Sequence, residues 1–226
     1  MPVRSPFLFV GWPKIALVLM LLLGGFVVLG CATEQRGSGT MASVTRDVSG
    51  FNEVALNGVG NLTIRQTGSE SLTIEAEDNV LPEISTEVEG NRLTIETEYD
   101  MPAPTQPINY ELTVRDLSAL ELPVAANVDA SDISTDSLDV TISGAGNMKI
   151  AGEADSQDIE ISGAGDYQAE DLESEEAEID ISGSGEVVVR VSDHLHVEVS
   201  GSGSVEYIGN PTVSRDITGA GEVRRR

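Results

Sequence analysis

Five copies of one pentapeptide, spaced about 19 residues apart, constrain the fold of this chain more than any other feature. Each copy reads aliphatic residue, Ser or Thr, Gly, Ala or Ser, Gly, and the copies lie at 142–146, 161–165, 181–185, 199–203 and 217–221. On both sides of each copy, apolar residues alternate with polar ones, which is the period of a β-strand. Each repeat therefore predicts a strand, a glycine corner, a second strand and a looser third side.

A repeat of this length is typical of one coil of a parallel β-helix, in which equivalent residues of successive coils stack at about 4.8 Å. One coil cannot bury its inward side chains, whereas stacked coils bury a continuous column. The alternative is an antiparallel sandwich with strands of about ten residues, but the constant period and the unchanging corner favour the solenoid. Glycines would supply positive φ or close backbone approach at each corner, and these corner residues are Gly144, Gly146, Gly163, Gly165, Gly183, Gly185, Gly201, Gly203, Gly219 and Gly221.

The segment from residue 51 to residue 114 also alternates but departs from this period. Short apolar–Thr–apolar runs at 62–64, 72–74, 93–95 and 112–114 predict four strands, and Gly90-Asn91 lies where a hairpin turn would. The open end of a solenoid presents an unpaired strand edge that invites aggregation. We therefore expect an all-β fold, a parallel β-helix with coils of about 19 residues, capped N-terminally by short antiparallel strands.

The first thirty residues have the pattern of a secretory signal. Arg4 and Lys14 are their only charged residues, and an uncharged apolar run follows at 15–29. This run is shorter than the roughly 20 residues that a membrane-spanning helix needs. It ends in Val28-Leu29-Gly30-Cys31, which resembles the bacterial lipobox, and the resemblance implies that the Cys31 thiol is diacylated, as by palmitate. The alternative is an uncleaved N-terminal anchor helix that contains a cysteine.

These patterns divide the chain into three segments. Residues 1–30 are predicted to be a lipoprotein signal peptide, and residues 31–45, which are small and polar, a flexible tether. Residues 46–226 are predicted to form the β-solenoid domain. Both interpretations of the N-terminus export the domain and attach it to a membrane, so we expect it in the bacterial cell envelope, at the outer membrane, in the periplasm or on the cell surface.

The composition excludes several functions. The chain has 38 Asp+Glu against 13 Lys+Arg and a formal charge of −25, and such a chain repels phosphate, which excludes nucleic acid as a partner. A single cysteine excludes an internal disulfide framework and a thiolate zinc site. The hydrophobic content of 40% is too high for a fully disordered chain.

Acidic residues recur at fixed positions of successive repeats. The position directly before each pentapeptide's aliphatic residue holds Thr141, Glu160, Asp180, Glu198 and Asp216, and the position two residues earlier holds Asp139, Asp158, Glu178, His196 and Ser214. If the coils stack in register, these residues form two outward columns whose carboxylates repel one another. One hypothesis is weak Ca²⁺ binding, because Ca²⁺ prefers oxygen ligands, and its candidate ligands are Glu160, Asp180, Glu198, Asp216, Asp158 and Glu178. The alternative is a solvated anionic face with raised carboxylate pKa values.

The sequence contains no recognisable catalytic motif. It has no G-x-S-x-G or H-E-x-x-H, and we interpret His194 and His196, two residues apart on one strand, as a polar strip rather than a metal pair. We therefore predict no enzyme activity and no cofactor beyond weakly bound Ca²⁺. The alternative is a β-helix enzyme, a lyase or hydrolase acting on polysaccharides. Such enzymes usually have aromatic platforms, whereas Tyr167 and Tyr207 occupy inward positions of the repeats.

Several motifs between residues 46 and 226 resemble those of one bacterial domain family. In chain order they are Phe51-Asn-Glu-Val54, Gly58-Val-Gly-Asn-Leu-Thr-Ile64, Leu72-Thr-Ile-Glu-Ala76, Asp78-Asn-Val-Leu-Pro-Glu-Ile84 and the Ser-Gly-Ala/Ser-Gly repeats. This set resembles the auto-transporter adhesin, head GIN domain family. The resemblance implies an exported β-helical solenoid, often lipid-anchored, with no established activity and no catalytic residues.

Together these features predict a lipid-anchored β-helical module of the cell envelope. It would contact the membrane through a lipid on Cys31. It would bind an envelope protein or a glycan, or have a structural role in the envelope.

Overall fold

The structure is a computed structural model that describes residues 36–226. Its regular structure is almost entirely β, with one 3-10 turn, η1 (Leu81–Glu83). The strands are β1 (Met41–Arg46), β2 (Glu53–Asn57), β3 (Asn61–Gln66), β4 (Ser71–Glu77), β5 (Ile84–Glu89), β6 (Arg92–Thr97), β7 (Asn109–Val114), β8 (Ala119–Leu122), β9 (Asn127–Ile142), β10 (Asn147–Ile161), β11 (Asp166–Ile181), β12 (Glu186–Val199), β13 (Ser204–Gly209), β14 (Thr212–Ile217) and β15 (Glu222–Arg225).

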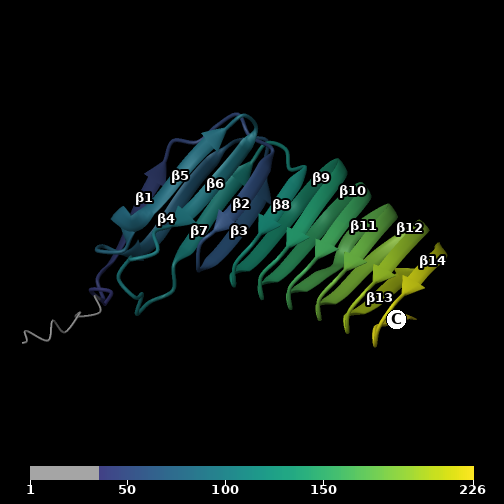
Figure 1. Ribbon diagram of the computed structural model, residues 1–226. Coiled ribbons are helices and arrows are strands. Elements are labelled where there is room, and N and C mark those ends of the chain that lie inside the picture. Colours follow the sequence, from purple (N-terminus) through teal and green to yellow (C-terminus); the bar gives the residue numbers. More distant parts are fainter. Residues whose placement is uncertain (1–35) are drawn as a thin grey trace, which may run out of the picture. The chain divides into compact units, whose positions relative to one another are not determined.

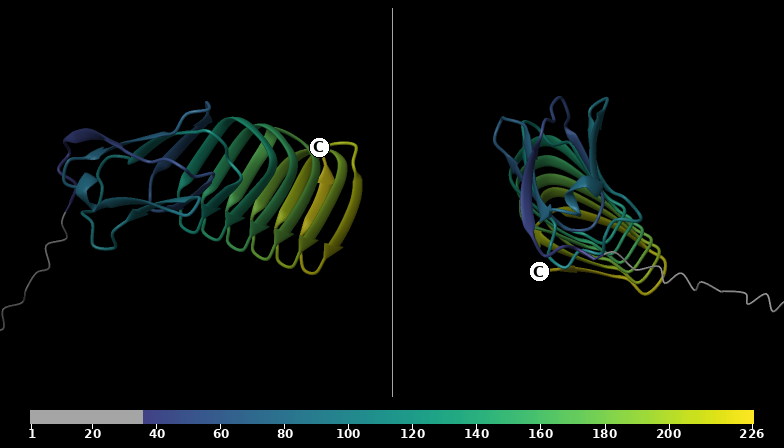
Figure 2. Two further views of the ribbon diagram at one scale, coloured as in Figure 1. Left: turned by 90° about the horizontal axis from the view of Figure 1, so that it is seen from above. Right: turned by 90° about the vertical axis from the view of Figure 1, so that its left-hand side faces the viewer.

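Two long faces enclose the core. Face A consists of β1, β4, β7, β3, the first halves of β9 to β12, β13 and β15. Face B consists of β5, β6, β2, β8, the second halves of β9 to β12, and β14. Each of β9 to β12 bends midway, so it runs from face A through a short third side to face B, and the chain returns to face A through a glycine corner (Figures 1 and 2).

Successive coils stack in parallel register, which confirms the predicted solenoid. The aliphatic residue of the pentapeptide forms one inward ladder, and its members are Ile142, Ile161, Ile181, Val199 and Ile217. The first four are at most 2% exposed. Because each ladder is completed by the neighbouring coils, a coil is stabilised chiefly by the apolar surface it buries against them.

The glycine corners serve close backbone approach rather than positive φ. Among the ten predicted corner glycines, only Gly219 has a positive φ, of 139°. At Gly183, a Cβ atom would fall inside contact distance of the Gly163 carbonyl oxygen in the preceding coil. The Ser184 N–H donates to that same oxygen at 2.9 Å. Any side chain at the first corner glycine would therefore separate two hydrogen-bonded coils.

The N-terminal cap is mixed rather than antiparallel throughout. β5 and β6 form the predicted hairpin around Gly90-Asn91, and β4 pairs antiparallel with β1 and β7. However, β3 pairs parallel with β7 and β9, and β2 pairs parallel with β6 and β8. The reason is that residues 53–66 already form a coil, in which Asn57-Gly-Val-Gly60 is an early copy of the glycine corner. Parallel stacking therefore begins inside the cap.

Arginines protect the C-terminal end of the solenoid. Arg215 occupies the inward position that Val197 holds in the preceding coil, and its Nη1 donates to the Val223 carbonyl oxygen at 3.4 Å. Arg224 forms an ion pair with Glu206 on the neighbouring strand. A charge at an inward position of an edge strand discourages pairing with a further strand, so the last coil ends the stack.

Residues 36–45 are held against the cap, which corrects the flexible tether predicted over 31–45. β1 pairs with β4 from Met41 onward. The buried carboxylate of Glu77 accepts hydrogen bonds from the Gly39 N–H at 2.6 Å, the Thr105 N–H at 2.8 Å and the Thr105 hydroxyl at 2.6 Å. The hydroxyl of Thr105, followed by the backbone donors, holds the pKa of Glu77 below its usual value. Small residues are needed here for contact, since a Cβ at Gly37 would overlap Glu77.

Candidate functional site

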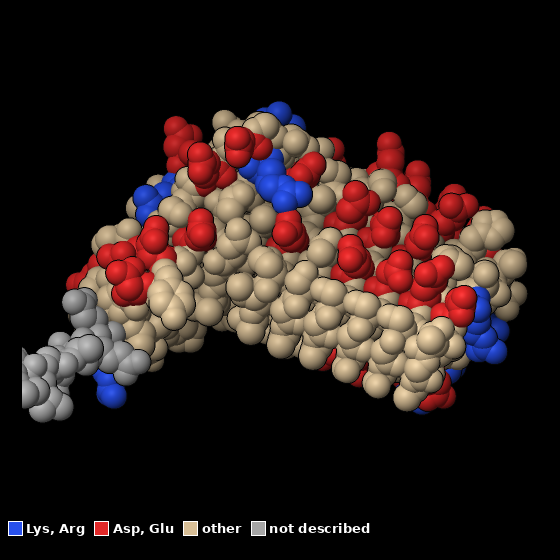
Figure 3. All heavy atoms as spheres, viewed as in Figure 1, with Lys and Arg blue, Asp and Glu red and all other residues tan. Residues whose placement is uncertain are grey.

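The predicted carboxylate columns form one patterned surface on face B, which we call the acidic face. One column contains Asp139, Asp158, Glu178, His196 and Ser214, and the next contains Thr141, Glu160, Asp180, Glu198 and Asp216. Most of these side chains are exposed. Figure 3 shows acidic side chains gathered over these coils, above the uncharged glycine corners.

Mutual repulsion within the acidic face is expressed at Asp158. Its register partners on the adjacent strands are Asp139 and Glu178. Partial burial first, and then the charges of Glu178, Asp139, Asp180 and Glu160, raise the pKa of Asp158 above its ordinary value, because each disfavours the charged carboxylate. The expectation of raised carboxylate pKa values is thus met at this residue.

The columns do not converge on a metal centre. Within residues 36–226, no group of three or more His, Cys, Asp or Glu side chains is arranged to hold an ion. A hollow of 280 Å³ lies beside His194 and His196, and His196 Nε2 is 3.4 Å from Glu198 Oε1. The carboxylates project from successive strands instead of toward one point, so the acidic face offers diffuse attraction rather than a coordination shell.

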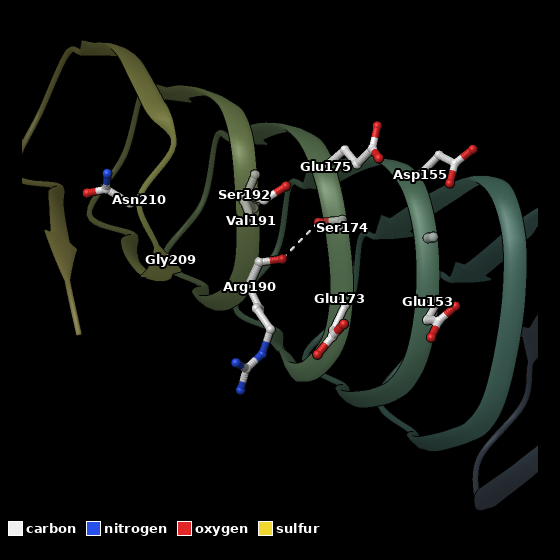
Figure 4. Close-up of a pocket in the computed structure, with 11 residues that line it drawn as sticks. Glu153, Asp155, Glu173, Ser174, Glu175, Arg190, Val191, Ser192, Gly209 and Asn210 are labelled. Atoms are coloured by element: carbon white, nitrogen blue, oxygen red, sulfur yellow. Dashed lines mark hydrogen bonds between the residues drawn. The ribbon is translucent and has the colours of Figure 1, made fainter.

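A larger hollow of 570 Å³ opens on the third side of the solenoid, and we call it the lateral hollow (Figure 4). Its floor is a ladder of small or aliphatic residues from successive coils, namely Ala154, Ser174, Val191 and Gly209. One wall holds Glu153, Glu173 and Arg190, and the other holds Asp155, Glu175, Ser192 and Asn210. The hollow therefore combines an apolar floor with carboxylate walls.

A shortening of the coils creates the lateral hollow. The repeat that begins at Asp166 has 20 residues up to its second corner glycine, and the one that begins at Glu186 has 18. The difference falls in the bend, where the pairing of β11 with β12 shifts register between Ala169 and Glu173. The wall recedes at β12 and leaves space over the floor. The unequal repeat lengths were the available signal, and an analysis that assumes a constant period misses the site.

A buried chain of hydrogen bonds lies beneath the lateral hollow. The Tyr167 hydroxyl donates to Gln157 Oε1 at 2.7 Å, Gln157 Nε2 donates to Ser174 Oγ at 2.8 Å, and the Ser174 hydroxyl donates to the Arg190 carbonyl oxygen at 2.9 Å. Gln157 is 2% exposed and stacks on the apolar side chain of Ala177. Burial raises the pKa of Tyr167 far above its ordinary value, so its hydroxyl stays protonated and acts as the donor. We call this chain the core relay.

The lateral hollow presents groups for recognition rather than for catalysis. The Arg190 guanidinium is engaged by the Glu170 carbonyl oxygen, at 2.8 Å from Nε, and the Ser174 hydroxyl is committed to the core relay. In this hollow no nucleophile is hydrogen-bonded to a base, which covalent catalysis requires. Its carboxylates can accept hydrogen bonds and attract positively charged groups.

Other predicted residues are placed as follows. Tyr167 is fully buried and Tyr207 is half-buried, as their inward positions predict, whereas Tyr99 is fully exposed. Cys31 and the signal peptide predicted over 1–30 lie outside the described residues. Within residues 36–226, no helix has the length and apolar character to cross a bilayer.

The fold and its surfaces define a class, that of parallel β-solenoids with a mixed N-terminal cap and a charged lateral surface. Within that class, the chain belongs to the family described as "Putative auto-transporter adhesin, head GIN domain", whose model matches residues 50–211. The family resemblance found in the sequence is thereby confirmed. No curated protein has a matching sequence.

Solved structures show the same fold. A putative adhesin from Bacteroides fragilis has a TM-score of 0.72 at 22% identity, with 84% of this chain and 99% of that chain covered. A putative lipid binding protein from Parabacteroides distasonis has a TM-score of 0.56 at 21% identity, covering 84% and 98%. A putative adhesin from the same organism has a TM-score of 0.53 at 21% identity, covering 85% and 99%.

Proposed function

We propose that the chain is a non-catalytic, adhesion-type module of the bacterial cell envelope that binds an envelope protein or a glycan. The observation that carries the proposal is the unbroken register of outward residues over β9 to β14, above a continuous buried core. A surface held this rigidly loses little conformational entropy when it binds a partner. The family description and the adhesin titles of similar structures support the same function.

Adhesion is tested in a bacterium that carries the gene. Deletion should reduce retention of the cells on a partner-coated surface, and complementation with the wild-type chain should restore it. Cross-linking in native cells followed by pull-down should capture an envelope protein or glycan. Unchanged retention after deletion would contradict the adhesion function, and oligosaccharide release from neutral or acidic polysaccharides by the purified chain would contradict its non-catalytic character.

We further propose that a lipid on Cys31 anchors the module after residues 1–30 are removed. The lipobox-like run that ends in Cys31, preceded by a basic and then an apolar segment, supports this anchor. Metabolic labelling with an alkynyl fatty acid should label the wild-type chain and the control Thr33→Ala. Cys31→Ala should lose the label and leave the membrane fraction. A labelled Cys31→Ala chain would refute the assignment.

The acidic face supports a second proposal, weak Ca²⁺ association at the columns. Carboxylates of Glu160, Asp180 and Glu198 occupy adjacent strands, and a divalent cation would relieve their repulsion. Millimolar Ca²⁺ should raise the unfolding temperature more than NaCl of equal ionic strength does. The gain should shrink in the variant Glu160→Gln/Asp180→Asn, and equal effects of the two salts would contradict the proposal.

A further inference from the structure

A second large hollow, of 540 Å³, lies where the cap meets the first glycine corner, and we call it the cap hollow. Asn57 and Val59 belong to that corner, which joins β2 to β3. Glu96, Tyr99 and Met101 belong to β6 and the segment that follows it. The cap hollow is separate from the lateral hollow and from the acidic columns, because none of the residues lining it belongs to either.

Exposed apolar side chains concentrate at the cap hollow. Among residues 36–226, only three large hydrophobic side chains are exposed, and two of them, Val59 at 42% and Tyr99 at 105%, line this hollow. The corresponding position of the regular corners holds Ala or Ser, so Val59 departs from the repeat. Apolar side chains gathered at one concave place on an otherwise polar surface mark a binding site, whereas scattered ones do not.

The polar groups of the cap hollow are mainly hydrogen-bond acceptors. Glu96 is the register partner of Asn57, so the two side chains neighbour each other at the ends of β6 and β2. Glu98 adds a second carboxylate. Asn57 Oδ1 is enclosed by protein and has no hydrogen-bond partner, a state that costs stability. Rotation of this side chain toward the hollow would break no hydrogen bond at Oδ1 and would expose that oxygen to a ligand donor.

This combination selects the ligand by its chemistry. Carboxylates accept hydrogen bonds but cannot donate them, so they require a ligand rich in O–H or N–H donors. The tyrosine ring and the aliphatic side chains require apolar C–H surface. The carboxylates and the net charge of −25 repel anions. A neutral saccharide meets all three conditions, because its hydroxyls donate and its ring faces present C–H groups.

We propose that the cap hollow binds a neutral saccharide, such as the end of a glycan chain. The ring of Tyr99 packs on one face of the sugar, with Val59 and Met101 beside it. Glu96, Glu98 and Asn57 accept hydrogen bonds from the sugar hydroxyls. The proposal rests on the adhesion-type function and names the ligand class for it.

The test is calorimetric titration of the full chain, solubilised in detergent, with glucose, galactose, mannose and their short oligomers. At least one of these sugars should bind. Tyr99→Ala should weaken that binding about fivefold to tenfold, the loss expected for one aromatic contact. Val59→Ala, which restores the residue type of the regular corners, should weaken it as well. Met41→Ala removes the third exposed hydrophobic side chain, which does not line the cap hollow, and should leave the affinity unchanged.

Asn57→Ala gives a signature that a purely structural role would not produce. It should weaken sugar binding while leaving the unfolding temperature unchanged or raised, because Oδ1 has no partner to lose. Absence of binding by every sugar, or binding that none of the three variants weakens, would overturn the proposal. Binding of tetramethylammonium in place of sugars would also overturn it and identify a cation site. Loss of cell adhesion in the deletion strain alongside absent sugar binding would leave the adhesion function standing and the saccharide assignment refuted.

Discussion

The core relay predicts strongly non-additive effects of mutation. Tyr167→Phe removes the donor to Gln157 Oε1, which lies on a side chain that is 2% exposed. An unsatisfied buried acceptor costs about 1–3 kcal/mol, so Tyr167→Phe should lower the free energy of unfolding by about that amount. Gln157→Leu should cost a similar amount, because it leaves the Tyr167 hydroxyl buried without an acceptor.

The double variant Tyr167→Phe/Gln157→Leu should be nearly as stable as the wild type. Both new side chains are apolar, and the Ser174 hydroxyl still donates to the Arg190 carbonyl oxygen. The two single costs together should therefore exceed the cost of the double variant by about 2 kcal/mol. Each kcal/mol corresponds to roughly 2–4 °C in the unfolding temperature of a chain this size.

Urea unfolding of the full chain, followed by circular dichroism, measures this coupling, and unchanged m-values would show that the denatured state is unaffected. The matched control combines Tyr167→Phe with Gln168→Leu on the exposed side of the same strand, and its effects should add. Effects of Tyr167→Phe and Gln157→Leu that add within about 0.5 kcal/mol would refute the view that the relay acts as one unit.

Three further predictions concern the corners, the acidic face and the C-terminal end. Gly183→Ala should lower the free energy of unfolding by about 1–3 kcal/mol through overpacking against the preceding coil, while Ser184→Ala, an exposed change in the same corner, should be near neutral in urea unfolding. Asp158→Asn should stabilise the fold at neutral pH. The folded state binds the Asp158 proton more tightly than the unfolded state does, so wild-type stability falls as pH rises from the ordinary pKa of an aspartate through the raised value. Unfolding measured across that range should show the advantage of Asp158→Asn vanish at the acid end, and an advantage independent of pH would count against the repulsion. Arg215→Val should extend the apolar ladder to the open end and promote concentration-dependent association, measured by sedimentation; a monomer at every concentration would contradict the protective role of Arg215.

The repeats carry most of the fold in their local pattern. Ile161 and Ile181 alternate with polar residues before an unchanging glycine corner, so strand, corner and register follow together. Once the corners stack, the neighbours Glu160 and Asp180 must lie side by side, and this is why the acidic face could be predicted from spacing alone.

The missed features depend on contacts that spacing does not encode. Gly39 and its neighbours have the composition of a flexible linker, but their partner Glu77 lies 38 residues away. Gln157 interrupts an apolar ladder, and only the fold shows that Tyr167 and Ser174 satisfy its amide. The lateral hollow arises from a change in coil length within the bend, where no side-chain pattern marks the register. The cap hollow depends on Tyr99, in a segment without regular structure.

The hydrogen bonds around Glu77 set how far the module can range from its anchor. A free linker from Cys31 to residue 45 would span up to about 50 Å when extended, whereas the five steps from Cys31 to Arg36 span at most about 17 Å. With a lipid on Cys31, the cap is thus kept on a short leash near the bilayer. Reach away from the membrane then depends on the stack itself, each added coil contributing about 4.8 Å. A bacterium could therefore tune the height of this module by duplicating whole repeats, without altering the cap.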